Sequence, residues 1–436
     1  MATTKPVAEV VTEGSSGATG GPAAGAKAAF AIPAFRSLWL NNVFFFLVMN
    51  AQRFVLGWLV LEGLNGNERT QGLVVFALGV PALFLVLHAG NWADRYNRKR
   101  LLVGSQIATL AVTLVAALLV QADVMTIELA IVVALAMGAT TAIGSPVRAA
   151  LVPALVPRAL LFTAIAATSL AMTTSMILGP VAANFVGDQL GLAAAFWFMS
   201  SLLAIGLVVL VPMEVPTHAD VEPAAAGTEP ETASYSVWAG SVEAFRHVVR
   251  DRALSRLFLL LTVAGSTVNP AVMVSIQAFV KEEFGRDAGD SAPILAVMGV
   301  GIAVSSFVVM RKGDMANKGA LFQRALMVGS LMTLLMGRTT AYWQLLPLSL
   351  MMGLGGGFYI NMNQGLIQSN TPQRLMGRVM ALYTLIQAGL LPVGALTLGY
   401  VGGAVGMGNA ISGAGIISLV VVLVVYSTDR EFRRLG

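Results

Sequence analysis

The sequence predicts an all-α membrane protein in which twelve transmembrane helices form two pseudo-symmetric six-helix bundles. The 436-residue chain is 56% hydrophobic and only 11% charged, whereas soluble domains are about one quarter charged. Apolar runs of about 20 residues, which is the length needed to cross a bilayer, recur along the chain. Short motifs of the first half also return in the second half in the same order, which indicates an internal duplication.

The apolar runs are expected to form six spans before a long polar break and six after it. They begin near Ser37, Gln71, Leu101, Ile127, Leu160 and Gly191, and then near Leu254, Ala292, Ala320, Tyr342, Met376 and Gly406. This spacing predicts an N-terminal bundle at residues 36–212 and a C-terminal bundle at residues 253–436.

Two polar segments flank these bundles. Residues 1–35 are mostly small, polar and Gly-rich, so we expect a disordered tail. Residues 213–252 begin with a stretch rich in Pro, Glu and Ala, which is typical of a flexible linker. The linker ends in a segment with helical apolar spacing, which we expect to lie on the membrane surface.

The short loops differ in charge, and this difference predicts the orientation. One set is basic and contains Arg95, Arg98, Lys99, Arg100, Arg148, Arg158, Arg311, Lys312, Lys318, Arg374 and Arg378. The other set carries most of the loop acids. Because basic loops stay in the cytoplasm, both termini and the linker are expected there, in a bacterial inner membrane. The net charge of +5 is therefore explained by topology, and we expect no nucleic-acid partner.

Three landmarks occur once in each half. Asp94-x-x-Asn97-Arg98 parallels Asp314-x-x-Asn317-Lys318 after the second span, and LVPALVPR parallels IQSNTPQR after the fourth span. LGP at residues 178–180 parallels LLPVG at residues 390–394 in the fifth span. Many secondary transporters are built from such duplicated halves, with the substrate site between them.

The stretch GNWADRYNRKRLL, at residues 90–102, matches the loop signature G-x-x-x-D-R-x-x-R-[RK] at Gly90, Asp94, Arg95, Arg98 and Lys99. With this signature and twelve spans, the chain resembles the major facilitator superfamily. Three other stretches resemble its bacterial exporter branch, which includes enterobactin-type siderophore exporters: SPVRAALVPALVPRALLFTAIA, GPVAANFVG and MGRVMALYTLIQAGLLPVGAL. The resemblance implies export of an amphipathic organic compound (a drug, siderophore or metabolite) by alternating access, with proton antiport as the family default.

The chain departs from this branch in two places. Many proton-driven drug exporters carry an arginine in the middle of the fourth span, whereas VVALAMGATTAIG at residues 132–144 contains none. In the fifth span Gly179 and Pro180 are kept, but Ala182 and Ala183 replace glycines of the exporter motif. Both departures weaken the expectation of proton antiport.

The resemblance also implies a conformational latch at the first cytoplasmic loop. In this fold the loop lies beside the start of the eleventh helix, where Asp94 would face the positive helix end or pair with Arg378. Gly90 would permit close helix approach, and Arg95 and Arg98 would orient Asp94. The contact would favour the outward-open state. The alternative is that the basic residues only set the topology.

Polar faces on four spans predict a central substrate cavity. Arg53 lies inside the first span, where a charge costs about 2.5–3.5 kcal/mol unless it faces a cavity or a partner. The expected cavity residues are Asn42, Phe46, Met49, Asn50, Arg53, Thr141, Asn269, Met273, Gln277, Tyr359, Asn361 and Gln364. The alternatives are helix packing for the amides and hydroxyls, and snorkelling or a structural ion pair for Arg53. If Arg53 is functional, an anionic substrate group or a nearby acid is its expected partner.

Gly179, Pro180 and Pro392 are hinge candidates because proline bends a helix, although structural kinks without gating are the alternative. Glu62, Asp188 and Glu282 lie at span ends and are the proton-coupling candidates, with solvated loop acids as the alternative. No acid lies in the apolar core of a span, and no phosphate-binding loop is present. The chain has no cysteine and three scattered histidines, so we expect no metal site, no cofactor and no enzymatic activity.

Two other functions stay open. One is an uncoupled facilitator or importer of a small organic solute, and the other is a non-transporting, sensor-like relative. We expect a monomer in the bilayer, with a small organic solute and, for an antiporter, protons as its partners.

Overall fold

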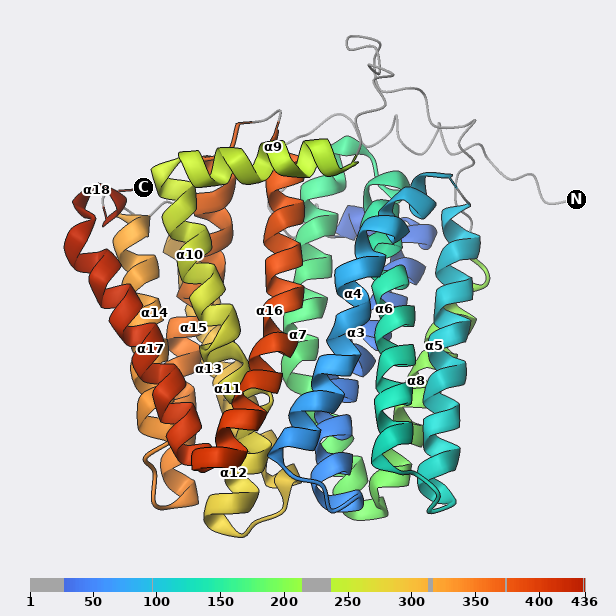
Figure 1. Cartoon of the computed structure of the whole chain (residues 1–436). Helices are drawn as coiled ribbons and strands as arrows, with labels where there is room; N and C mark the ends of the chain where they lie inside the picture. The colour runs from blue at the N-terminus through green and yellow to red at the C-terminus, as the bar shows by residue number, and fades with distance from the viewer. Residues whose placement is uncertain are drawn as a thin grey trace, which may run out of the picture.

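The computed structural model describes residues 27–95, 97–213, 237–312, 317–372, 375–433 and 435. Long helices run side by side between two ends of the molecule (Figure 1). Within the described residues, twelve helices are long and apolar enough to cross a membrane. Their first residues lie within about one helical turn of the positions predicted from the sequence. The predicted twelve-helix fold is therefore confirmed.

The first six spans form the N-terminal bundle. Its elements are α3 (Pro33–Trp58) with the π-helical turn η1 (Leu59–Gly63), α4 (Glu68–Arg95), α5 (Arg98–Gln121), α6 (Ile127–Leu155), α7 (Arg158–Leu190) and α8 (Leu192–Leu210). Helix α3 packs against α7 and α8, α4 packs against α6, and α5 packs against α6 and α8.

The last six spans form the C-terminal bundle. Its elements are α10 (Arg252–Ser266), α11 (Val268–Met273), α12 (Ser275–Phe284), η2 (Ala288–Asp290), α13 (Ser291–Lys312), α14 (Lys318–Met336), η3 (Tyr342–Gln344), α15 (Leu345–Ser369), α16 (Met376–Val405), α17 (Met407–Thr428) and α18 (Arg430–Arg433). The pairs α10–α16, α13–α15, α14–α15 and α14–α17 repeat α3–α7, α4–α6, α5–α6 and α5–α8. The helix pairing therefore follows the duplication seen in the sequence.

Glycine makes the same close contact in both bundles. A Cβ atom at Gly138 of α6 would clash with the Leu78 carbonyl oxygen of α4. A Cβ atom at Gly353 of α15 would clash with the Met298 carbonyl oxygen of α13. Only glycine lets the two backbones approach this closely, as is common between membrane helices. The Gly-rich stretch of the tenth span therefore serves close packing.

The seventh span is interrupted, which the apolar pattern did not predict. Helix α10 ends at Ser266 and α11 ends at Met273, with Thr267 and Val274 between the helical pieces. Pro270 lies within α11, and a proline lacks an N–H and clashes with the carbonyl group four residues earlier, here that of Ser266. The Thr267 hydroxyl donates to the Val263 carbonyl oxygen at 2.6 Å. The seventh span is therefore interrupted at a depth where a ligand could bind.

Helix α9 (Val237–Arg250) lies across the ends of the bundles (Figure 1). Ala244 and Val248 are buried against the start of α10, whereas Phe245 and Val249 are exposed. We call this end of the molecule, which also holds the start of α3, the α9 end, and the opposite end the α12 end. The expected helical surface segment is present in the described part of the linker.

The described part of the expected N-terminal tail is helical. Residues 27–30 form a helical turn and α3 begins at Pro33. The Phe30 ring packs edge-on against Trp39, with the ring centroids 5.0 Å apart, so apolar burial orders this segment. Residues 1–26 and 214–236 of the expected tail and linker lie outside the described residues.

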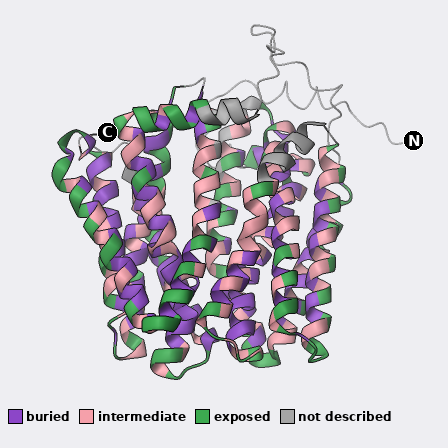
Figure 2. Cartoon of the chain, viewed as in Figure 1, coloured by how far each residue is buried: buried purple, intermediate pink, exposed green. Residues whose placement is uncertain are grey.

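The distribution of burial fits a bilayer environment. Figure 2 shows buried residues where helices face one another and exposed residues around the periphery. Many of the exposed side chains are large and apolar, among them Phe185 and Val208. Soluble monomers rarely expose contiguous apolar surface of this kind, and lipid is its natural partner.

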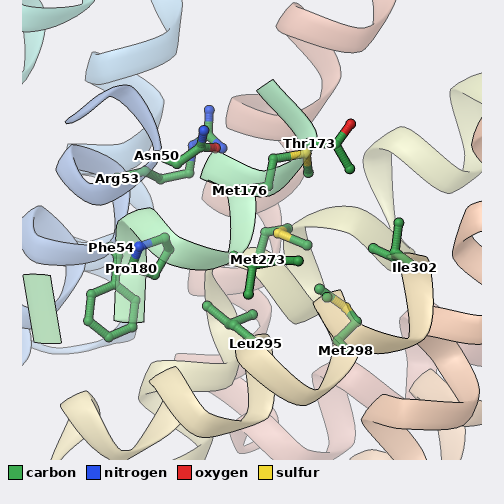
Figure 3. Close-up of a pocket in the computed structure, with 12 residues that line it drawn as sticks. Asn50, Arg53, Phe54, Thr173, Met176, Pro180, Met273, Leu295, Met298 and Ile302 are labelled. Atoms are coloured by element: carbon green, nitrogen blue, oxygen red, sulfur yellow. The ribbon is translucent and has the colours of Figure 1, made fainter. Parts of the chain in front are cut away.

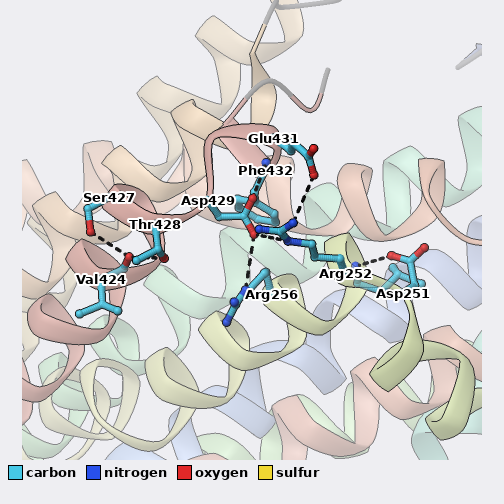
Figure 4. A network of polar contacts seen from close by, with 10 residues as sticks. Asp251, Arg252, Arg256, Val424, Ser427, Thr428, Asp429, Glu431 and Phe432 are labelled. Atoms are coloured by element: carbon cyan, nitrogen blue, oxygen red, sulfur yellow. Dashed lines mark hydrogen bonds and ion pairs between the residues drawn. The ribbon is translucent and has the colours of Figure 1, made fainter.

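At the α9 end, a buried carboxylate connects the first and last membrane-spanning helices of the C-terminal bundle, α10 and α17 (Figure 4). Asp429 is 1% exposed and accepts from Arg252 Nε at 3.0 Å, and Arg256 Nε lies 3.6 Å away. Its other oxygen accepts from the Phe432 N–H at 3.1 Å. Burial disfavours the charged form, but these hydrogen bonds and the two arginines outweigh it and lower the pKa of Asp429. The network fixes the start of α10 against the end of α17.

Candidate functional site

A pocket lies between the two bundles at the depth of the membrane (Figure 3). Helices α3 and α7 form its N-terminal wall, and α11 and α13 form its C-terminal wall. It is lined by Asn50, Arg53, Phe54, Thr173, Met176, Ile177, Pro180, Met273, Leu295, Met298, Gly299 and Ile302. Both walls would move if one bundle rocked against the other.

Arg53 supplies the charged group of the pocket. It precedes Gly63, the end of η1, by ten residues, or about 15 Å along the helix. Its side chain is half-buried, and no described residue forms a hydrogen bond or an ion pair with its guanidinium. Asn50 lies one turn earlier on the same face (Figure 3), and its Nδ2 donates to the Phe46 carbonyl oxygen at 2.9 Å. No described group donates to Asn50 Oδ1.

The rest of the pocket is almost entirely apolar. Three methionines, Met176, Met273 and Met298, come from three different helices. Methionine is flexible and polarizable, so such a surface adapts to ligands of different shape. A mostly apolar pocket with a few polar groups is the usual form of a site for an organic molecule.

Amide side chains join the bundles on the α12 side of the pocket. Gln277 Nε2 of α12 donates to the Phe54 carbonyl oxygen of α3 at 3.0 Å. Gln71 Nε2 of α4 donates to Gln277 Oε1 at 2.8 Å and to the Val274 carbonyl oxygen at 3.3 Å. Gln71 and Gln277 are both buried, so water is excluded from this layer.

Charged groups close the α12 end further out. Lys281 Nζ lies 3.2 Å from Glu62 Oε2 and also donates to the Leu61 carbonyl oxygen. Glu62 Oε1 accepts from the Ala288 N–H at 3.0 Å, and Arg69 Nη2 donates to the Gly403 carbonyl oxygen at 3.1 Å. Among the described residues, the polar contacts that join the two bundles all lie toward the α12 end. The protein is therefore closed at that end.

The structure brings some of the expected cavity residues together and separates others. Asn50, Arg53 and Met273 line the pocket, as does the hinge candidate Pro180. Gln277 belongs to the closure beside it. Phe46, Met49, Thr141 and Asn269 are half-buried outside the lining.

The remaining four lie within the bundles or on an exposed helix face. Asn42 is buried inside the N-terminal bundle, and Tyr359 is buried in the C-terminal bundle, stacked on Phe322 at 5.4 Å between ring centroids. Asn361 Nδ2 donates to Ser306 Oγ at 3.1 Å. Gln364 is exposed on α15.

Arg148, which the sequence analysis placed among the loop charges, lies inside α6 and is only 3% exposed. Its guanidinium donates to Asn42 Oδ1 at 2.9 Å, to Gln106 Oε1 at 2.6 Å and to Asn41 Oδ1. It also lies over the Phe45 ring, 3.8 Å from the centroid. At 29 residues, the helix runs about two and a half turns further than a 20-residue span requires, so the apolar run alone placed its end too early.

At the expected latch, the side chains of Gly90, Asp94 and Arg95 lie outside the described part of the chain. The backbone is helical as far as Arg95. Arg98 Nη1 donates to the Ala150 carbonyl oxygen at 3.4 Å. Arg378 Nη1 lies 2.6 Å from Glu243 Oε2 of α9. The latch stays a prediction.

The hinge candidates lie within unbroken helices. Pro180 is inside α7 and Pro392 is inside α16. A Cβ atom at Gly179 would lie 2.6 Å from the Leu47 carbonyl oxygen, so this glycine lets α7 approach α3 closely. A Cβ atom at Gly79 of α4 would clash with the Pro392 ring. The prolines thus lie at helix contacts, and their role as hinges stays a prediction.

The three proton-coupling candidates lie at the α12 end and not in the pocket. Asp188 is exposed and accepts from Gln189, and Glu62 belongs to the closure. Glu282 Oε2 accepts from the Met407 N–H at 3.0 Å. Partial burial raises the pKa of Glu282, and the charges of Glu68 and Glu283 add to the rise against the opposing hydrogen bond. Glu282 therefore holds its proton to a higher pH than a free glutamic acid.

The wall formed by α7 and α13 was missed by the sequence analysis. Leu295, Met298, Gly299 and Ile302 follow a helical spacing, but α13 is apolar on all faces. In a membrane helix the lipid-facing side is as apolar as a pocket, so periodicity does not distinguish them. Of the residues that α7 contributes to the lining, only Thr173 is polar.

Twelve spans in two duplicated bundles around a central pocket define a multi-pass membrane transporter. The family model described as the Major Facilitator Superfamily matches residues 38–395, and the chain belongs to this superfamily. No curated protein matched the chain in a sequence search.

Solved structures confirm the fold at low sequence identity. A variant of the nucleoside transporter NupG is 14% identical, with a TM-score of 0.72, over 90% of this chain and 100% of that one. A POT family transporter in complex with 5-aminolevulinic acid is 13% identical, with a TM-score of 0.71, over 91% and 96% of the two chains. The tetrameric PepTSo2 is 16% identical, with a TM-score of 0.67, over 93% and 99%.

Proposed function

We propose that this transporter exports an amphipathic organic compound by alternating access. The observation that carries the proposal is the pocket, which is lined by both bundles and closed on one side by contacts between them. Rocking the bundles would open the α12 end and expose the same residues to the other side of the membrane.

We further propose that the α9 end is cytoplasmic and that the protein lies in a bacterial inner membrane. The loops at the α9 end carry most of the basic residues, as expected for cytoplasmic loops. The closed α12 end then faces outward, and a solute would enter the pocket from the cytoplasm. This orientation would let the protein bind its cargo from the cytoplasm, as export requires.

Importers and uncoupled facilitators share this fold, so they are the alternatives. The exporter-like stretches of the sequence favour export. The candidate coupling acids lie at the α12 end, away from the pocket, which favours a facilitator over an antiporter that exchanges protons at the substrate site. A monomer is proposed in each case.

Flux through purified protein in proteoliposomes tests the proposal. A panel of lipophilic cations, siderophores and small anions would be measured with and without a pH gradient. We expect flux of at least one amphipathic solute, and Met298→Trp, which fills the pocket, should abolish it. Met351→Trp on the exposed face of α15 is the matched control and should leave flux unchanged.

The outcomes separate the candidates. Flux that requires the gradient supports antiport, and flux without a gradient supports a facilitator. Flux that survives Met298→Trp contradicts the assignment of the pocket. No flux of any solute favours the sensor-like alternative.

A further inference from the structure

We infer that the cargo carries an acidic group and that the guanidinium of Arg53 binds it. This inference rests on the proposed function, because it assigns a substrate class to the same pocket. It concerns amphipathic organic anions: an apolar body with one carboxylate, sulfonate or phosphate.

A comparison of two arginines at membrane depth carries the first step. Arg148 has three amide oxygens and an aromatic ring around its guanidinium, so its charge is satisfied within the N-terminal bundle. Arg53 has no such shell in the described structure, although it too lies inside a membrane-spanning helix. A charge inside the membrane is normally paired or faces a water-filled cavity. Arg53 faces the pocket, so its partner must come from the solute or from water that the solute replaces.

The surroundings of Arg53 define the shape of the solute. The guanidinium presents several N–H donors in a plane and binds planar or tetrahedral oxyanions through two parallel hydrogen bonds. Asn50 Oδ1, one turn away, can accept a hydrogen bond from a hydroxyl or amide beside the acid. The opposite wall, with Met273, Leu295 and Met298, offers only apolar contact. A charged head on α3 and an apolar body against α11 and α13 therefore fit the site.

The charge balance supplies a driving force. The empty pocket carries one positive charge, and the pocket loaded with a monoanion is neutral. Each cycle then moves one negative charge across the membrane. An inside-negative potential of 100 mV favours the outside anion by about fiftyfold, so export could proceed without a titratable acid in the pocket.

The first test needs no cargo. The chain has no cysteine, so Thr173→Cys places a single thiol in the pocket. Its reaction rate would be measured with anionic sulfonatoethyl and cationic trimethylammonioethyl methanethiosulfonates. We expect the anion-to-cation rate ratio to fall about tenfold or more in Arg53→Gln, since a charge that lines the same pocket acts strongly at low dielectric. Arg338→Gln, which removes an exposed cation just after α14, is the control and should leave the ratio unchanged.

The second test adds probes of fixed charge. Naphthalene-2-sulfonate, its neutral sulfonamide and the naphthyl trimethylammonium cation would compete with labelling of Thr173→Cys. We expect only the sulfonate to protect the thiol from labelling. This protection should be lost in Arg53→Gln and partly recovered in Arg53→Lys. In proteoliposomes, sulfonate flux should follow a valinomycin-imposed potassium potential.

Several results would overturn the inference. The first is an anion-to-cation rate ratio that is the same with and without Arg53. The second is a thiol at position 173 that neither reagent labels. The third is protection by the cation or the sulfonamide that is as strong as protection by the sulfonate. Flux of the cation with none of the sulfonate would reject the anion and leave the proposed transport function standing. Protection by none of the probes, together with no flux, would contradict both.

Discussion

At the scale of single residues, burial and partners give two arginines opposite roles. Arg148 is enclosed by Asn41, Asn42 and Gln106 inside one bundle, so it holds α3, α5 and α6 together. Arg53 lies between the bundles without a described partner. Sequence alone predicted a role for Arg53 from its depth, and it counted Arg148 among the basic residues that set the topology. Whether a charge is satisfied depends on neighbouring helices, and one helix's sequence does not reveal those.

Arg148→Gln should destabilise the protein without removing the pocket. The shorter amide leaves buried oxygens of the cluster without donors, and each such oxygen costs about 1–3 kcal/mol. We expect a lower midpoint in thermal unfolding followed by size-exclusion fluorescence. The unfolding midpoint of Arg148→Lys should lie between those of Arg148→Gln and the parent protein, because an ammonium keeps the charge but lacks the planar fork of a guanidinium. A variant as stable as the parent protein would show that the cluster does not support the bundle.

At the scale of elements, the contact between α4 and α16 holds the bundles together at the α12 end. A Cβ atom at Gly72 would lie 2.7 Å from the Ala395 carbonyl oxygen of α16. A Cβ atom at Gly399 of α16 would lie 3.3 Å from the Gly72 Cα atom. Backbone atoms form both sides of this contact, so neither side can yield cheaply. The length of the apolar runs predicted the helices themselves. The sequence did not predict this contact, because glycines occur throughout the chain.

Gly72→Val should open the α12 end. The added side chain clashes with the α16 backbone in the closed state and is relieved when the bundles separate there. We expect faster labelling of Thr173→Cys by a membrane-impermeant reagent applied from the α12 side. Gly104→Val is the control, since a Cβ atom at Gly104 meets no atom within 4 Å. Equal labelling in Gly72→Val, Gly104→Val and the parent would contradict a role of this contact in closure.

At the scale of the whole molecule, the proposed alternating access requires closure at each end in turn. The described contacts close the α12 end, and the loop at residues 90–102 was predicted to close the other. In this state Arg378 is paired with Glu243 of α9. A latch to Asp94 would therefore require Arg378 to exchange its partner, or Asp94 to use the helix end instead.

Asp94→Asn should keep membrane insertion but shift the population toward the state that is open at the α9 end. An acid at a helix N-terminus is worth about 0.3–2 kcal/mol, which is roughly a twofold to thirtyfold shift in population. Spin labels at Arg100→Cys and Asn317→Cys, one on each bundle, would report the distance at this end. Asp123→Asn, in a loop of the α12 end, is the control. An unchanged distance distribution would reject the latch.

The sequence by itself determined the twelve spans, the duplication and the superfamily. These follow from apolar length, which the bilayer thickness sets, and from a local loop motif. It also indicated Asn50, Arg53 and Met273, because polar or irregular residues stand out against an apolar helix.

Only the tertiary structure decided which helices form the pocket, where the seventh span breaks and which end is closed. A lipid-facing side and a pocket-facing side are equally apolar, so periodicity did not show which side of α7 or α13 faces the pocket. Closure depends on contacts such as Gln71 with Gln277, whose residues are far apart in the chain. Such contacts arise from the packing of two bundles, and the pattern of any one span does not encode them.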